Sequence, residues 1–125
     1  MDRIITITGS DPVKKTLTLS DKGVTNAIPG DQVTWKIGEG SGVAAIVGII
    51  NKKNSPDVFS PDPHQLPGST DWQGTVSTGL TFKPNEEEKI EEYSIIWNSV
   101  SGGGWIQKDP INGVVTDPQI RVKPQ

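Results

Sequence analysis

The single histidine of this chain, His64, offers the widest choice of chemistry in the sequence. Asp57 and Asp62 precede it and Asp71 follows it. One imidazole with carboxylates suits zinc or manganese, and the carboxylates alone suit calcium. However, four prolines interrupt residues 52–70, and the sequence contains no regular calcium loop. We therefore predict no metal site and interpret His64 as a surface loop residue; a metal-binding or enzymatic protein that uses this loop is an alternative.

The sequence contains few side chains that could carry covalent or acid–base catalysis. The chain contains no cysteine, which removes a thiolate nucleophile, a disulfide and a cysteine metal ligand. A Ser-His-Asp triad has to use His64, and no serine lies in a Gly-x-Ser-x-Gly setting. The acidic run at residues 86–92 is expected to be a solvated face whose glutamates stay ionised, so it supplies no general acid. We predict that the protein is not an enzyme and has no cofactor.

The four tryptophans fall into two pairs. Trp35 and Trp97 lie on the apolar faces of predicted strands, which is typical of core residues. Trp72 and Trp105 lie beside polar residues and glycine at loop edges, where aromatic rings can stack on sugars or anchor a protein partner. The other interpretation is that each caps an open end of the fold, with its indole N–H bonded to a loop carbonyl. A carbohydrate-binding module using Trp72 and Trp105 is therefore a second alternative.

The composition predicts one all-β domain over residues 1–125. A chain of 125 residues is long enough for one hydrophobic core and short for two. Its 14 glycines and 10 prolines, with Thr, Val and Ile between them, indicate short strands joined by tight turns.

Charge and hydropathy exclude some classes of binding partner. A net charge of −3 gives no basic face for nucleic acid or anionic lipid. The longest apolar run, at residues 43–50, is far below the roughly 20 residues that cross a bilayer. The first residues lead directly into a strand-like segment without a signal-peptide pattern. We expect no nucleic-acid or membrane partner and a cytoplasmic location, or export if a signal peptide has been removed.

The alternation of apolar and polar residues predicts where the strands that carry these side chains lie. The pattern predicts strands near residues 3–8, 14–20, 31–37, 43–51, 72–77, 89–98 and 118–123, with shorter ones near 24–28 and 104–107. The turn at residues 20–23, with Leu17 and Leu19 before it, predicts a hairpin.

Three of these strands carry a family resemblance. Pro29-Gly30-Asp31 introduces a strand with Val33, Trp35 and Ile37 on one face, Tyr93, Ile95 and Trp97 alternate in the same way, and an Ile-x-Val strand ends the chain. Over residues 14–123 this pattern resembles the cupredoxin family. The resemblance implies a single Greek-key β-sandwich, with immunoglobulin-like topology as the alternative.

The copper chemistry of that family is missing from this chain. A blue-copper centre needs two histidines and a cysteine, commonly with a weak methionine ligand. This sequence has one histidine, no cysteine, and methionine only at position 1. Residues 98–105 stand where the family carries its Cys-x-x-His ligand loop, and they supply no good copper ligand. We therefore predict a copper-free, non-catalytic binding or assembly module that acts through protein–protein contacts.

The first strand offers a contact for such a module. Residues 3–8 are apolar, contain no proline and carry only Arg3 as a charge. Such a segment is either covered within the domain or used to pair with another chain. Ile4 and Ile5 point to opposite faces, so one of the two is exposed on a one-sided sheet. We expect weak self-association or capture of a protein partner through this strand, and we expect Ile5 to contact the partner.

Overall fold

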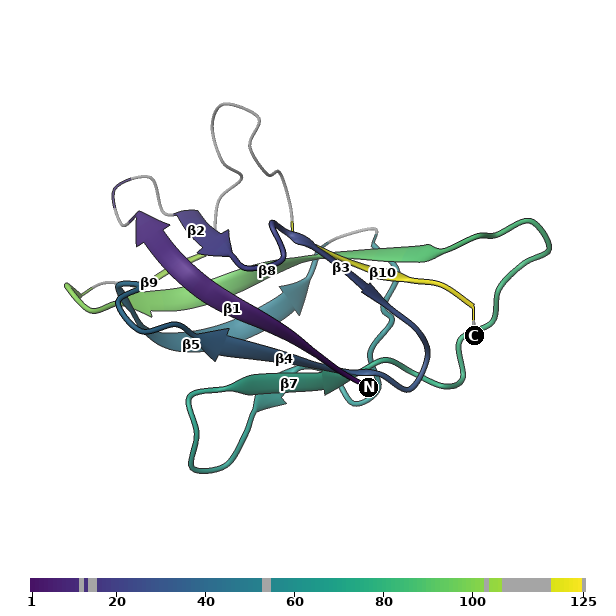
Figure 1. Ribbon diagram of the computed structural model, residues 1–125, viewed down its shortest axis with the longest axis horizontal. Coiled ribbons are helices and arrows are strands. Elements are labelled where there is room, and N and C mark those ends of the chain that lie inside the picture. Colours follow the sequence, from purple (N-terminus) through teal and green to yellow (C-terminus); the bar gives the residue numbers. More distant parts are fainter. Residues whose placement is uncertain (12, 14–15, 53–54, 103, 107–117, 125) are drawn as a thin grey trace.

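Two β-sheets packed face to face make up the described part of the chain (Figure 1). This computed structural model describes residues 1–11, 13, 16–52, 55–102, 104–106 and 118–124. The first sheet has the strand order β2 (Thr16–Leu19), β1 (Asp2–Asp11), β4 (Gln32–Ile37), β7 (Trp72–Thr75) and β6 (His64–Gln65). The second has the order β3 (Val24–Ala27), β10 (Gln119–Val122), β8 (Lys89–Ser99) and β5 (Val43–Asn51), and β9 (Gly104–Ile106) also pairs with β8. The predicted all-β sandwich is confirmed.

Both sheets mix parallel and antiparallel pairs. β1 runs parallel to β4 in the first sheet, and β3 runs parallel to β10 in the second. The other strand pairs are antiparallel, including the β1–β2 hairpin and the long β5–β8 pair. Parallel neighbours cannot be joined by a tight turn, so the chain must cross between the sheets more than once.

The core lies between the sheets and follows the alternation in the sequence. Val33 and Trp35 of β4 face Tyr93, Ile95 and Trp97 of β8, and all five side chains are fully buried. This confirms the predicted inward faces of both strands. The buried apolar cluster also contains Ile5, Ile7, Leu19, Ala27, Val43, Ile46, Ile49, Val58, Phe59, Val76, Ile120 and Val122.

One aromatic group ties the two sheets together at the centre of the core. The indole N–H of Trp35 donates to the hydroxyl of Tyr93 at 3.1 Å, and their rings meet edge to face. Phe59 also packs against Trp35, with 5.9 Å between ring centroids. Because the indole nitrogen and the phenol oxygen are bonded to each other, the polar tip of each ring has a hydrogen-bond partner inside the core.

The turn at residues 20–23 differs from its predicted role. It joins β2 of the first sheet to β3 of the second, so it is a crossing between sheets and not a hairpin turn. Lys22 and Gly23 both have positive φ, and Asp21 accepts the Gly23 N–H and the Thr25 hydroxyl. These local bonds turn the strand direction out of the first sheet. The hairpin that contains β2 is formed with β1.

The Pro29-Gly30-Asp31 turn is fixed by a buried carboxylate. Asp31 is 2% exposed, and its Oδ2 accepts the Ile28 N–H at 3.1 Å and Arg3 Nε at 3.0 Å. Burial acts to raise the pKa of Asp31, but these hydrogen bonds and the Arg3 charge outweigh it and hold the pKa below its usual value. The ionised carboxylate therefore anchors β4 to the start of β1.

We expect Asp31→Asn to lower the free energy of unfolding at pH 7 by about 2 kcal/mol, because the buried hydrogen bonds from Ile28 and Arg3 lose the negative charge that strengthens them. Since the folded pKa is lowered, this stabilisation is present above the unfolded pKa and disappears as pH falls through the folded pKa. Urea unfolding at neutral and strongly acidic pH checks it. Asp71→Asn is the control, because the Lys36–Asp71 pair is more exposed to solvent and contributes less to stability. Equal losses for both variants would contradict the role given to Asp31.

Candidate functional site

The side chains of the His64 loop do not come together as a ligand set. His64 lies exposed in β6, and its Nδ1 is 2.9 Å from the Asp62 carbonyl oxygen. Asp71 pairs with Lys36 at 2.8 Å, while Asp57 accepts the Phe59 N–H. Within the described ranges, no group of three His, Cys, Asp or Glu side chains is placed to hold a metal ion.

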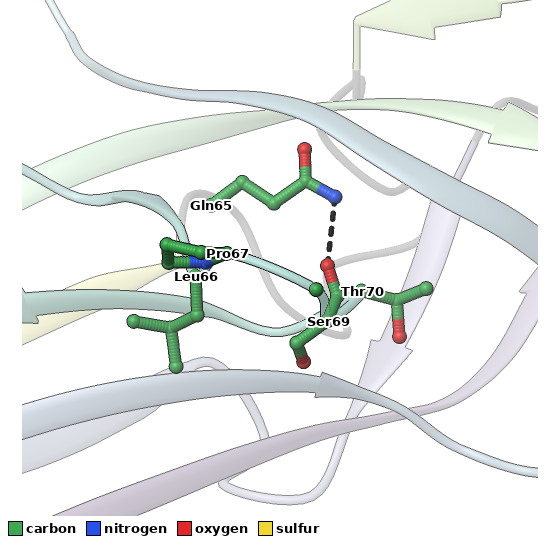
Figure 2. A pocket seen from close by; sticks show the side chains of 6 residues that line it. Gln65, Leu66, Pro67, Ser69 and Thr70 are labelled. Carbon is green, nitrogen blue, oxygen red and sulfur yellow. Dashed lines mark hydrogen bonds between the residues drawn. The ribbon is translucent and has the colours of Figure 1, made fainter.

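A shallow depression of about 520 Å³ lies beside this loop (Figure 2). Figure 2 shows that its lining comes from one turn, residues 65–70, between β6 and β7. The Gln65 amide donates to the Ser69 carbonyl across it at 2.9 Å. The lining carries no ionisable side chain, so this depression has no group for acid–base chemistry.

Trp72 is bonded within the sandwich. Its ring is half-buried and packs on the core, and its Nε1 donates to the Ile46 carbonyl of β5 at 3.0 Å. The indole N–H therefore links β7 of one sheet to the edge of the other, and the acceptor is a strand carbonyl and not a loop carbonyl. Trp105 lies in β9, opposite Trp97, and its side chain is outside the described part of the structure.

The strand at residues 3–8 is covered on both sides only from Thr6 onward, and residues 3–5 pair with β4 alone among the described strands. β1 lies between β2 and β4, and β2 pairs with it from Ile7 onward. Ser20 bonds to β1 at the preceding residue, Thr6. Its N–H donates to the Thr6 carbonyl, and its hydroxyl accepts the Thr6 N–H. Ile5 is fully buried in the core, and Ile4 is the exposed member of the pair at 52%. Ile5 is therefore not available on the surface of the folded chain.

The long apolar edge belongs to β5. Among the described strands, β5 pairs with β8 alone, so one side of its backbone has no strand neighbour. Its nine residues contain neither a charge nor a proline. Val47 and Ile50 are about half exposed, at 52% and 45%. This combination is the one that natural proteins usually avoid at a free sheet edge.

Part of that edge is protected. The pairing with β8 shifts register at Ala44 and again at Val47, which leaves these two residues as bulges. Next to the second bulge, the Ile46 carbonyl already accepts the hydrogen bond from Trp72 Nε1. Regular pairing with β8 runs from Gly48 to the end of β5, so this stretch is the open part of the edge. We call Ala44, Val47, Gly48, Ile50 and Asn51 the β5 surface.

The acidic run at residues 86–92 is not solvated throughout, as its composition predicts, because it contains one buried carboxyl group. Glu91 is 2% exposed, and its Oε1 accepts the Val58 N–H at 2.9 Å. A cavity of about 210 Å³ adjoins it, lined by Ile49, Ile50, Asn51, Asp57, Asp62, Pro63 and Glu91. Burial raises the pKa of Glu91 to about 7; the Asp57 and Asp62 charges add to this, against the bonds from Val58 and Asn51.

The signal for Glu91 was present in the strand pattern. Positions 91, 93, 95 and 97 share one face of β8, and the last three are the core aromatic and aliphatic residues already predicted to point inward. Charge composition suggested a solvated segment, but the two-residue period decides the direction of each side chain.

No protein-family model matches this chain, and a search of curated proteins finds no match. The described residues form no helix that is long and apolar enough to cross a membrane. The fold defines an all-β sandwich with two mixed sheets. Among the described strands, β5 is the longest that lies at the end of a sheet.

Proposed function

We propose that this protein is a non-catalytic binding or assembly module of the copper-free cupredoxin-like kind, and that the β5 surface is its protein contact. The observation that carries the proposal is the nine-residue, uncharged strand that pairs on one side only among the described strands. Such an edge presents backbone N–H and C=O groups to an extended segment of another chain, and alternate side chains add apolar contact.

A second copy of this chain is the partner that the chemistry of β5 favours. The chain carries a net charge of −3, so most faces of two copies repel each other weakly. β5 carries no charge, and like charges therefore do not meet when two copies of it pair. Antiparallel pairing of two β5 strands about a two-fold axis joins the second sheets of both copies and closes the assembly at a dimer.

The strand directions support the cupredoxin-like proposal over the immunoglobulin-like one. Immunoglobulin sandwiches consist of two antiparallel sheets, whereas this chain has a parallel pair in each sheet. The carbohydrate alternative has less support, because Trp72 uses its indole N–H inside the fold. The alternative based on His64 has less support because its expected partners are engaged elsewhere.

We expect the chain to self-associate weakly, with a mean mass that rises toward a dimer as concentration approaches about 1 mM, where a contact of about 4 kcal/mol shows. Ile50→Lys places a charge on the open part of the β5 edge and should keep the protein monomeric over the whole range. Light scattering on the intact chain and the variant measures this.

Thr18→Lys is the matched control, because Thr18 is exposed in β2 at the edge of the other sheet. It should dimerise as the unmodified chain does. A monomeric unmodified chain at about 1 mM, or loss of dimer in both variants alike, would rule out β5 as a self-contact.

A further inference from the structure

The segment at residues 55–63 connects the two sheets, and we call it the crossing segment. On the side of the first sheet, Phe59 forms a bridge with Val76, and the Ser60 N–H donates to the Thr75 carbonyl at 2.8 Å. On the side of β8, the Ser55 hydroxyl accepts the Glu92 N–H. The deepest anchor on β8 is the Glu91 carboxyl group, which accepts the Val58 N–H.

This anchor differs from the others because it can gain or lose a proton. Ser55, Thr75 and Val76 use hydroxyl or backbone groups, which keep the same charge over the ordinary pH range. Glu91 is buried beside a cavity of about 210 Å³, so its ionised form is poorly solvated while the segment is in place.

We propose that Glu91 is a proton-controlled latch: in its neutral form it holds the crossing segment against β8, and in its ionised form it weakens that hold. The latch is a property of the fold and does not depend on the proposed contact at β5.

The charges around Glu91 set the direction of this effect. The crossing segment brings Asp57 and Asp62 toward it, and both carboxylates repel an ionised Glu91. Tyr93 faces it from the same strand. Asn51 of β5 and Ile120 of β10 are its uncharged neighbours on the two flanking strands. Opening the segment lets the carboxylate reach water and separates it from both aspartates.

Two effects compete when Glu91 ionises. The Val58 N–H bonds more strongly to a carboxylate than to a neutral carboxyl group, which favours the closed segment. Burial and the two aspartates favour the neutral form, and they prevail, because the pKa is raised to about 7. The closed segment is therefore stabilised by the proton, and opening becomes easier as pH rises toward neutrality and above.

Amide hydrogen exchange with residue resolution tests the latch on the intact protein. After correction for the intrinsic pH dependence of exchange, we expect the protection factor of the Val58 amide to fall by roughly tenfold or more between pH 5 and pH 8. In Glu91→Gln the bond acceptor is kept without a titrating group, so protection should stay constant. Asp57→Asn should shift the midpoint to lower pH, because one repelling charge is removed.

The Ile95 amide distinguishes local opening from global unfolding, because Ile95 lies in the centre of the core. At pH 8 the latch predicts much lower protection at Val58 than at Ile95. Protection at Val58 that does not change with pH would overturn the proposal. So would equal protection at Val58 and Ile95 at pH 8, because the segment would then open only with the whole protein.

Discussion

Replacing Trp35 by alanine is expected to lower the free energy of unfolding by about 3–5 kcal/mol, the range for deleting a large buried aromatic side chain. Trp35 is fully buried, and it contacts Phe59 and Tyr93 across the interface between the sheets. The substitution leaves a cavity at the centre of the core and removes the donor that satisfies the Tyr93 hydroxyl. A loss of this size unfolds a large fraction of a marginally stable domain.

Gln32→Ala is the control for this prediction, since Gln32 is exposed in the same strand. Thr34 is a poorer control than its outward position suggests, because it is 4% exposed and its hydroxyl donates to Asp2. Urea unfolding of the two variants should give well-separated midpoints at equal slopes. Similar midpoints for Trp35→Ala and Gln32→Ala would contradict the central position of Trp35.

Stability should fall as pH rises from about 4.5 toward 7, because Glu91 ionises in the unfolded chain before it ionises in the folded one. In this window the folded state binds more protons than the unfolded state, so raising the pH favours unfolding. The pKa of Glu91 is 4.5 in the unfolded chain and about 7 in the folded one. At alkaline pH this difference lowers the free energy of unfolding by about 3 kcal/mol. Glu91→Gln should remove this dependence, matching the unmodified protein near pH 4 and exceeding it in stability at pH 8.

Glu87→Gln is the matched control, because Glu87 belongs to the same acidic run but is exposed. It should keep the pH dependence of the unmodified chain. Urea unfolding between pH 4 and pH 8 provides the comparison. If Glu91→Gln lost stability at every pH, the carboxyl group would be a structural acceptor without the titration assigned to it.

The parts of the fold that could be predicted are those in which local pattern and burial agree. The alternation of Val33 and Trp35 with polar residues predicts β4, and that of Tyr93, Ile95 and Trp97 predicts β8, because a strand with one buried face needs that period. Both strands lie at the centre of the core, where side-chain burial controls register most strongly.

The parts that could not be predicted depend on which strands become neighbours. The turn at residues 20–23 has the composition of a hairpin turn, and nothing local shows that it crosses between sheets. The positions of β1 and β5 in their sheets could not be predicted for the same reason. Both strands are apolar and free of proline, but only β5 lies at the end of its sheet. The two-residue period of β8 places Glu91 on the buried face, whereas its acidic neighbours in the sequence indicate a solvated segment.

Amide NMR spectra recorded from about 50 µM to about 1 mM show directly whether β5 is the contact strand of this module. We expect concentration-dependent chemical-shift changes at residues 44–51 and at their β8 neighbours, with β1 and β2 unchanged. Shifts that gather on β1, or spectra that stay the same over the whole range, would contradict it.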